Sequence, residues 1–345
     1  MKKLLSIVLA AVMLLSALAV SAKPADERAS FLPDDAAHLE GYIVGDGAGE
    51  TGAKWVGFSP DNPGETEIYT FHLTTYGAAY YNGTVYGYVY GYEEDGTFHD
   101  EFYTIDLATR IPTYYEDAHS GELVYGMAYD YSTNTMYALL NDEAPWIGTV
   151  DLATGAITRV TNVNLGSYLG IYGLAIDLDG NMYVMSLSAV GGKLLKVNKT
   201  NGSLTLCAST NRPCFYAQCI TYDPATNKIY WAEVDGPNTY TNGLYSFDLD
   251  NNYAFDYHGV IGTNYELMAM YSTAKPETGA SSVGDVNGDG TIDMQDALLA
   301  LRISMGIFTP NEEQSAAADV NGDGSVGVDD ALVILRYAMG LIASL

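Results

Sequence analysis

The chain has 345 residues and is strongly acidic, with 43 Asp and Glu residues against 15 Lys and Arg residues and a formal net charge of −28 at pH 7. A field of that sign repels nucleic acid and anionic membrane surfaces, so we exclude both as partners. Neutral glycans, cations and other proteins stay open as ligands.

The three cysteines are too few for a disulfide framework, and their odd number leaves at least one thiol without a partner in the chain. A bond between Cys207 and Cys214 is conceivable. Cys219 lies in a β-rich run, and we expect it to be buried on a strand.

The amino terminus has the three regions of a secretory signal peptide. Met1-Lys-Lys3 is basic, residues 4–20 are apolar, and Val20-Ser-Ala22 supplies small residues for cleavage. A permanent membrane anchor is the alternative, but the apolar run is short for a bilayer span and ends in a cleavable pattern. The sequence therefore predicts a signal peptide over residues 1–22 and a secreted, extracellular protein. Binding to a scaffold on the cell surface would keep the protein there.

Between residues 30 and 272 the chain repeats one pattern of β-strands. The first strand of each unit recurs every 46 to 49 residues, a period in the range of propeller blades. The five copies are Gly77-Ala-Ala-Tyr-Tyr, Gly126-Met-Ala-Tyr-Asp, Gly173-Leu-Ala-Ile-Asp, Cys219-Ile-Thr-Tyr-Asp and Leu267-Met-Ala-Met-Tyr. A turn, a second strand and a further hairpin follow each of the first four, which predicts four strands per unit.

The two ends of the array complement each other. Residues 41–73 supply three strands without an inner one, whereas residues 267–271 supply an inner strand without its three followers. Joining them closes a ring and leaves no open sheet edge. We therefore predict a mainly β fold with a five-bladed β-propeller over residues 30–272, and a six-bladed propeller is the alternative. By pattern only, this part resembles secreted propellers of the WD40-like and quinoprotein-like kind.

The two faces of this propeller are predicted to differ. Short repetitive turns such as residues 131–135 lie on one face, and long irregular loops lie on the other. Because loops on a rigid scaffold carry function, we expect any ligand site on the irregular face. Acidic residues that break the repeat there, near Trp146 and Trp231, are Glu93, Glu94, Asp95, Asp142, Glu143, Glu233 and Asp235.

Two hypotheses for the propeller follow, beside the plainer interpretation of solvated acidic loops and packed strand aromatics. In the first, the aromatic rings stack a sugar while carboxylates bind its hydroxyls, or the module binds a protein. In the second, the acids make a glycoside hydrolase or polysaccharide lyase. Asp130, Asp177 and Asp223 occupy matching positions, and we interpret them as turn caps, because catalysis needs carboxylates in unequal environments. No catalytic residue is assigned, and binding is favoured over catalysis.

Residues 273–282 are the predicted flexible linker, and two near-copies of a twelve-residue loop follow it. Residues 285–296 have the sequence DVNGDGTIDMQD and residues 319–330 the sequence DVNGDGSVGVDD, each before an apolar helix, predicted over residues 297–305 and 331–342. Such loops bind calcium through oxygens at positions 1, 3, 5, 7, 9 and 12, and glycine at position 6 makes the sharp turn. Candidate ligands of two Ca²⁺ ions are Asp285, Asn287, Asp289, the Thr291 carbonyl, Asp293 and Asp296, and Asp319, Asn321, Asp323, the Ser325 carbonyl and Asp330.

The run GDVNGDGTIDMQDALLALRISMG, followed by ADVNGDGSVGVDDALVILRYAMG, resembles a type I dockerin over residues 283–345. The resemblance implies a small α-helical domain with two EF-hand-like calcium loops that binds a cohesin domain of a scaffoldin in a cellulosome. It also implies that cohesin contacts come from Met294, Gln295, Arg302, Val328, Asp329 and Arg336. Aspartate at position 12 and a poor helix before the first loop separate this module from calcium sensors. The difference between Met294-Gln295 and Val328-Asp329 favours one docking orientation.

Overall fold

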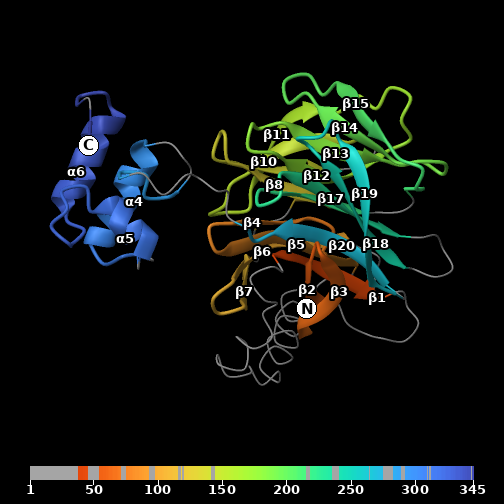
Figure 1. The fold of residues 1–345 in the computed structure, drawn as a ribbon, viewed down its shortest axis with the longest axis horizontal. Coiled ribbons are helices and arrows are strands. Elements are labelled where there is room, and N and C mark those ends of the chain that lie inside the picture. The colour runs from red at the N-terminus through yellow and green to blue at the C-terminus, as the bar shows by residue number, and fades with distance from the viewer. Residues whose placement is uncertain are drawn as a thin grey trace, which may run out of the picture.

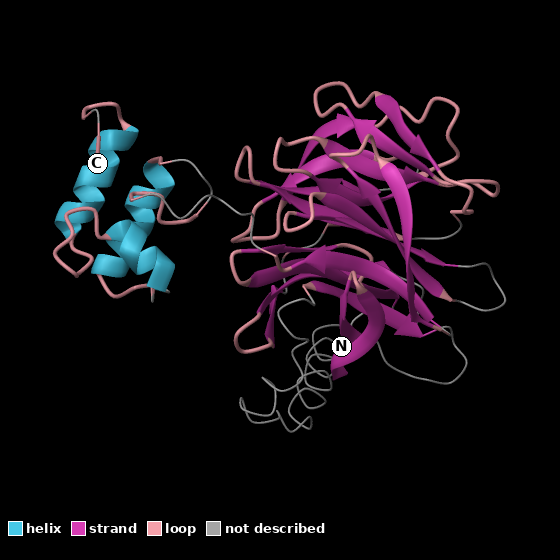
Figure 2. Cartoon of the chain, viewed as in Figure 1, coloured by secondary structure: helices cyan, strands magenta, loops and turns pink. Residues whose placement is uncertain are grey.

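The computed structural model describes the greater part of the chain after its first 37 residues. The described residues are 38–45, 54–70, 75–92, 98–115, 118, 120–140, 144–214, 218–234, 241–263, 265–274, 283–288, 292–308, 310, 312–342 and 344–345. In these residues the strands end at Ser272 and the helices begin at Met294 (Figures 1 and 2).

The strands form five antiparallel sheets of four strands each. One sheet consists of β4 (Ala78–Tyr81), β5 (Thr84–Tyr92), β6 (Phe98–Asp106) and β7 (Ile111–Tyr115). The next consists of β8 (Val124–Asp130), β9 (Thr135–Leu140), β10 (Trp146–Val150) and β11 (Ile157–Asn162). A third consists of β12 (Ile171–Ile176), β13 (Met182–Ser186), β14 (Lys193–Val197) and β15 (Leu204–Ser209). A fourth consists of β16 (Cys219–Asp223), β17 (Lys228–Val234), β18 (Asn242–Asp248) and β19 (Ala254–Gly262).

The fifth sheet closes the ring with strands from both ends of the array. Its order is β20 (Tyr265–Ser272), β1 (Leu39–Gly45), β2 (Lys54–Ser59) and β3 (Asn62–Thr70). Leu39 pairs with Ser272, so the inner strand comes from the end of the array and the other three from its start. The inner strands β4, β8, β12, β16 and β20 pack side by side around the axis. The prediction of five blades with this closure is confirmed, and the six-bladed alternative is wrong.

Apolar and aromatic side chains fill the spaces between neighbouring blades. One such cluster joins Met185 of β13 to Trp231 of β17 and Phe247 of β18, all fully buried. Alternation along each strand sends every second side chain to one of the two blade interfaces. Strands with blades on both sides are therefore buried on both faces, as in β13, where all five residues are buried.

One face of the propeller, here called the turn face, carries the short connections within blades. Its described connections are residues 60–61, 82–83, 107–110, 131–134, 151–156, 177–181, 198–203, 224–227 and 249–253. The opposite face, here called the loop face, receives the connections between second and third strands and those between blades. The predicted turns at residues 131–135, 178–181 and 224–227 all lie on the turn face.

Four of the five turns between third and fourth strands share one arrangement, which the closing blade lacks at residues 60–61. Each opens with a side-chain oxygen that accepts two backbone N–H groups, as Asp151 does from Ala153 and Thr154, both at 2.9 Å. Each ends with a residue at positive φ, which glycine and asparagine tolerate best. Those residues are Arg110, Gly155, Gly202 and Asn252, with φ values of 57°, 71°, 68° and 50°.

Arg110 is an unusual residue at a positive φ. Its side chain belongs to a buried network of hydrogen bonds around Glu40 in the closing blade, here called the Glu40 lock. Its guanidinium donates to both oxygens of Glu40 in β1, at 3.0 and 3.1 Å, and lies 4.3 Å from the centre of the Trp55 ring. Glu40 also accepts from Trp55 Nε1 at 3.0 Å and from the Tyr271 hydroxyl at 2.9 Å. Glu40 therefore joins β1, β2 and β20 to the neighbouring blade.

Three helices lie among the described residues after the propeller: α4 (Met294–Ser304), α5 (Glu312–Ala318) and α6 (Val328–Ala338). Helices α4 and α6 pack against each other around Ala300 and Ile334, both fully buried. None of the helices in the described part of the chain is long and apolar enough to cross a membrane.

The two predicted helices are present, but both begin three residues earlier than predicted, inside the loops. Helix α6 also ends before the predicted residue 342, because Gly340 takes a φ of 68° and the chain reverses there. Leu341 N donates to the Arg336 carbonyl at 2.8 Å, and Ile307 N donates to that of Arg302 at 2.9 Å, so both helices end in the same glycine motif.

Helix α5 was not predicted from the sequence. Its residues, Glu-Glu-Gln-Ser-Ala-Ala-Ala, are mostly strong helix formers, and the helix leads directly into the second loop at Asp319. The first loop instead follows a turn at residues 283–284. The second half of the module thus has an entering helix, although one of only seven residues.

Candidate functional site

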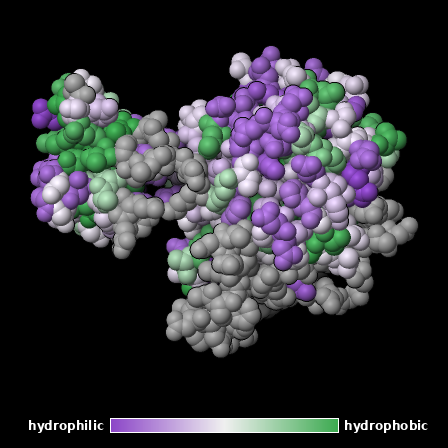
Figure 3. All heavy atoms as spheres, in the orientation of Figure 1, coloured by the Kyte–Doolittle hydropathy of each residue, from purple (hydrophilic) through white to green (hydrophobic). Residues whose placement is uncertain are grey.

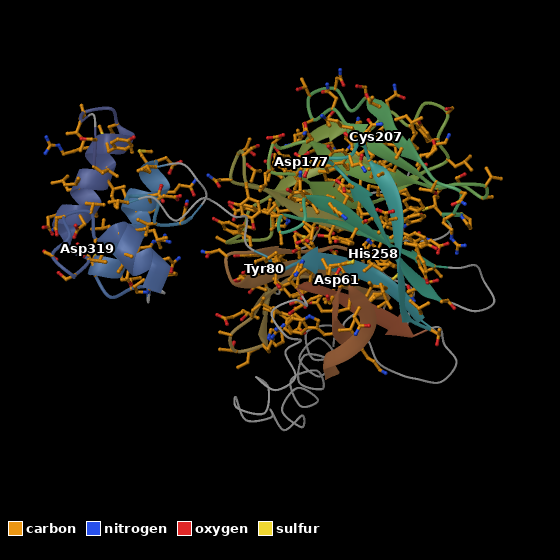
Figure 4. The ribbon with its side chains drawn as sticks, viewed as in Figure 1. Asp61, Tyr80, Asp177, Cys207, His258 and Asp319 are labelled. Carbon is orange, nitrogen blue, oxygen red and sulfur yellow. The ribbon has the colours of Figure 1, made fainter. Side chains whose placement is uncertain are left out.

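The second loop is labelled at Asp319 in Figure 4. Hydrogen bonds from its own backbone N–H groups stabilise its conformation. Asp319 accepts from Asp323 N at 3.0 Å and from Gly324 N at 2.8 Å, and Asn321 Oδ1 accepts from Asp323 N at 2.8 Å. Gly322 and Gly324 have φ values of 73° and 85°, which place the turn where the sequence predicts it. A hydrogen bond from the Ser325 hydroxyl lowers the pKa of Asp323, so this carboxylate stays ionised.

The aspartates at position 12 have the same environment in both loops. Asp330 accepts from Asn321 N at 3.1 Å and from Gly327 N at 2.8 Å. Asp296 accepts from Asn287 N at 3.0 Å and from Asp293 N at 2.9 Å. Both side chains are 0% exposed, and each joins the start of its loop to the first turn of the helix that follows.

These residues fit a calcium ion. Asp330 is fully buried, and within the described residues no Lys, Arg or His forms an ion pair with it. A buried carboxylate is costly unless a cation offsets its charge. Each oxygen that accepts one N–H keeps a second lone pair, and carboxylate, amide and carbonyl oxygens are the ligands that calcium takes.

The first loop is described in part. Asp289, Gly290 and Thr291 lie outside the described residues, whereas Asp285 is 1% exposed. Asp293, the predicted ninth-position ligand, caps α4, since its carboxylate accepts from Gln295 N at 2.7 Å. A carboxylate has two oxygens, so this cap is compatible with a calcium contact. In the second loop Gly327 stands at that position and offers no side chain.

The residues predicted to contact a partner are all exposed on α4 and α6. Met294 is 66% exposed and Val328 59%, and Gln295, Arg302, Asp329 and Arg336 are also exposed. The structure adds apolar residues that the sequence interpretation did not single out, and they repeat at the same spacing in both halves. These are Leu298, Met305 and Ile307 in one half and Leu332, Met339 and Leu341 in the other. Hydrophobic residues gather on the surface of this module in Figure 3.

The three matching aspartates of the propeller are structural, as interpreted from the sequence. Asp223 accepts from His38 Nε2 at 2.9 Å, from Thr226 at 2.6 Å and from Ser272 at 2.8 Å. Burial alone would raise its pKa, but these hydrogen bonds outweigh burial and lower the pKa below the usual 3.8.

Asp130 and Asp177 have equivalent roles. Asp130 is fully buried, accepts from Ser132 and Thr133 in its own turn, and pairs with Lys199. Asp177 accepts from the backbone and side chain of Asn181, both at 2.8 Å. All three aspartates therefore cap turns on the turn face, where Figure 4 labels Asp177.

The two tryptophans proposed to stack a sugar are packed inside the blades instead. Trp231 is 0% exposed and its Nε1 donates to Gln218 at 2.7 Å. Trp146 is 6% exposed, its Nε1 donates to Glu122 at 2.6 Å, and the Arg159 guanidinium covers its ring at 4.1 Å. The plainer interpretation of packed strand aromatics is confirmed for both residues and the sugar-stacking hypothesis is wrong, because strand alternation directs them into blade interfaces.

Of the acids that break the repeat, the structure describes Glu233. It is 1% exposed, and Arg212 Nη2 donates to both of its oxygens at 3.0 and 3.1 Å. This ion pair closes it off from solvent. The others lie outside the described residues: Glu93, Glu94, Asp95, Asp142, Glu143 and Asp235.

The cysteines have no functional arrangement. All three thiols are free, so the conceivable Cys207–Cys214 bond is not formed. Cys219 lies buried on β16, as predicted. Burial raises the pKa of Cys214 to about 12, which keeps it protonated and unreactive.

The fold defines the class: a closed five-bladed β-propeller followed by a small helical module with two EF-hand-like loops. Residues 283–338 match the dockerin type I domain family, so this segment of the chain is a dockerin type I domain. Domains of this family bind calcium. No curated protein matches the chain in sequence.

Solved structures resemble the chain only weakly. TolB from Acinetobacter baumannii is 12% identical with a TM-score of 0.40, covering 68% of each chain. An α-L-arabinofuranosidase, CtGH43, from Clostridium thermocellum is 15% identical with a TM-score of 0.41, covering 55% of this chain and 72% of that one. A protein of unknown function from Bacteroides thetaiotaomicron is 12% identical with a TM-score of 0.37, covering 64% of each.

Proposed function

We propose that this protein is a secreted component of a cellulosome-type assembly and docks, with calcium, onto a cohesin domain of a scaffoldin. The observation that carries the proposal is the dockerin type I domain at residues 283–338. In this proposal residues 1–22 are the signal peptide, which lies outside the described residues, residues 30–272 are the propeller, and residues 273–282 link it to the dockerin at 283–345. The propeller is the delivered module, and it binds carbohydrate or protein during polysaccharide degradation.

Two ions, one in each loop, are part of this proposal. Calcium, when bound, neutralises the loop carboxylates and so removes their mutual repulsion. The chain itself does the rest: backbone N–H groups orient the oxygens of Asp319, Asn321 and Asp323, and Asp330 joins the loop to α6. Asp285, Asn287, Asp293 and Asp296 would act in the same way in the first loop, together with Asp289 and Thr291.

The cohesin contact is proposed to use the exposed faces of α4 and α6. These faces combine apolar side chains such as Leu298 and Leu332, about half exposed at 50% and 54%, with one arginine on each helix. Exposed apolar area of this kind marks a protein interface. Arg302 and Arg336 can donate to carboxylates or carbonyls at its rim.

The test is capture of the full-length protein on an immobilised cohesin of the same organism. We expect retention in calcium, release by chelator, and loss of retention in the double variant Asp296→Ala with Asp330→Ala. Asp179→Ala is the matched control, because it removes an equally charged but exposed side chain from the turn face. Retention that persists after chelation would contradict the proposal.

A further inference from the structure

Five residues stand at one register position at the loop-face ends of the inner strands, each immediately before the repeated motif. They are Tyr76, Tyr125, Tyr172, Gln218 and Glu266. Because the five inner strands pack side by side around the axis, these residues surround the axis at the loop face. We call them the mouth ring.

Three members of the mouth ring form a continuous row of tyrosines. Tyr76 and Tyr125 are stacked with ring centres 5.4 Å apart, and Tyr125 meets Tyr172 edge to face at 4.8 Å. Tyr90, from the loop-face end of β5, extends the row by stacking on Tyr76 at 4.5 Å. All four side chains are half-buried, so they are fixed in place yet reach the surface. Every phenol hydroxyl is both a hydrogen-bond donor and an acceptor.

The other two members are polar and break the repeat. Gln218 is buried, at 2% exposed, and its Oε1 accepts from Trp231 Nε1 at 2.7 Å, so it supports the ring from inside. Glu266 is half-buried, and burial raises its pKa above the usual 4.5. In the described residues no donor reaches its carboxyl group. A half-buried acid of this kind gains free energy from a hydrogen-bond donor that a ligand brings.

We propose that the mouth ring, extended by Tyr90, binds a neutral carbohydrate chain through hydrogen bonds to its hydroxyl groups. The row offers phenol hydroxyls and aromatic rings on one side, with the half-buried carboxyl of Glu266 on the other. This combination of aromatic surface and a few placed polar groups is typical of ligand sites. The mouth ring holds no cationic residue and the chain carries a net charge of −28, so an anionic ligand is disfavoured.

The mouth ring and the carboxy-terminal end of the propeller lie on opposite faces. The chain leaves the propeller on the turn face, where Thr273 N donates to the His38 carbonyl at 2.8 Å. Ala274 lines a small central pocket there together with Tyr80, which Figure 4 labels. The mouth ring lies on the opposite face of the propeller from Thr273 and Ala274. This inference rests on the carbohydrate-binding half of the proposed function.

Affinity electrophoresis of the full-length protein in gels containing single polysaccharides tests the inference. The panel contains neutral β-glucan, xyloglucan, arabinoxylan and galactomannan, with anionic polygalacturonate for comparison. The variants are Tyr125→Ala, Tyr125→Phe and Glu266→Gln. Tyr80→Phe is the control, because Tyr80 is a half-buried tyrosine of an inner strand on the turn face. A melting curve for each variant establishes that it is folded.

We expect one neutral polysaccharide to retard the wild type in a manner insensitive to salt. Tyr125→Ala should weaken binding roughly tenfold, and Tyr125→Phe and Glu266→Gln roughly threefold each, the effect of one hydrogen bond. Tyr80→Phe should bind as the wild type does. Neutral binding that survives all three variants overturns the site but leaves a carbohydrate-binding propeller standing. Absence of any neutral binding, or salt-sensitive binding to charged ligands alone, overturns both.

Discussion

The propeller and the dockerin are both built from repeats, but the repeated residues have different roles in the two regions. In the dockerin the repeated residues are the candidate calcium ligands, and Asp296 and Asp330 among them accept hydrogen bonds from equivalent backbone groups in two copies of one loop. In the propeller the repeated aspartates cap turns, and the candidate ligand site combines three repeated tyrosines with Glu266, which breaks the repeat. A repeat whose copies share one set of oxygen ligands keeps those residues in each copy. A repeat that only supports a ring leaves its loops free to diverge.

The propeller depends on its closure, so we expect the largest single effect there. Arg110→Ala should lower the free energy of unfolding by about 3 to 5 kcal/mol, because it leaves the buried Glu40 carboxylate without its cation. The measurement is chemical denaturation of the full-length protein, followed by tryptophan fluorescence.

Arg159→Ala is the matched control for that variant. Arg159 also covers a tryptophan and pairs with an acid, Glu122, at 3.7 Å, but its side chain is 51% exposed. Its removal should cost less than about 1 kcal/mol. Equal effects of the two substitutions would show that the Glu40 lock does not hold the ring together.

Calcium removal should separate the two regions. At a free calcium concentration about 100-fold above its dissociation constant, the ion adds roughly 2.7 kcal/mol per site to a fold that binds it. In scanning calorimetry, chelation should lower the melting temperature of the dockerin and leave that of the propeller unchanged. A propeller transition that moves with calcium would mean that the ions act outside residues 285–330.

Acid should weaken the propeller through its turn caps. The pKa values of Asp130 and Asp223 lie below 3.8 in the folded protein, so their stabilising contribution is present above that pH and is lost as the pH falls below it. Asp223→Asn should cost about 1 to 3 kcal/mol at neutral pH and reduce this acid dependence. Denaturation curves at neutral and acidic pH measure both, and an acid dependence unchanged in the variant would contradict the assignment.

Docking orientation gives the smallest expected difference. Leu298 and Leu332 are equivalent and similarly exposed, at 50% and 54%. In contrast, Gln295 of the first repeat corresponds to Asp329 of the second, which accepts from Asn321 Nδ2 at 3.0 Å. We predict one preferred orientation. One of Leu298→Asp and Leu332→Asp should then lower cohesin affinity more than about tenfold, and the other less than about twofold. Weak effects of both single variants with loss of binding in the double variant would indicate two orientations.

The sequence predicted most of the architecture because its signals are local or periodic. Five spaced inner strands and two complementary ends determine the closed ring, and the spacing of oxygen side chains identifies the calcium loops. Helix boundaries were less accurate, since α4 and α6 begin inside the loops at Met294 and Val328. Helix α5 was missed because its seven residues, rich in alanine and glutamate, are too short for an apolar period.

The sites on the propeller were harder to predict because they depend on which strands are neighbours. Trp146 and Trp231 were candidates for stacking a sugar because acidic residues lie near them in the sequence, yet strand alternation buries both side chains. The row through Tyr76, Tyr125 and Tyr172 joins residues nearly 50 positions apart, and their common register one residue before each repeated motif was the available signal.

The central claim is that calcium-loaded loops attach this protein to a cohesin. Titration calorimetry of the full-length protein against the partner cohesin, with and without chelator, tests it most directly. The account predicts one-to-one binding in calcium, none in chelator, and loss of binding in the double variant Asp296→Ala with Asp330→Ala while Asp179→Ala binds normally. Equal affinity with and without calcium, or full binding by the double variant, would contradict it.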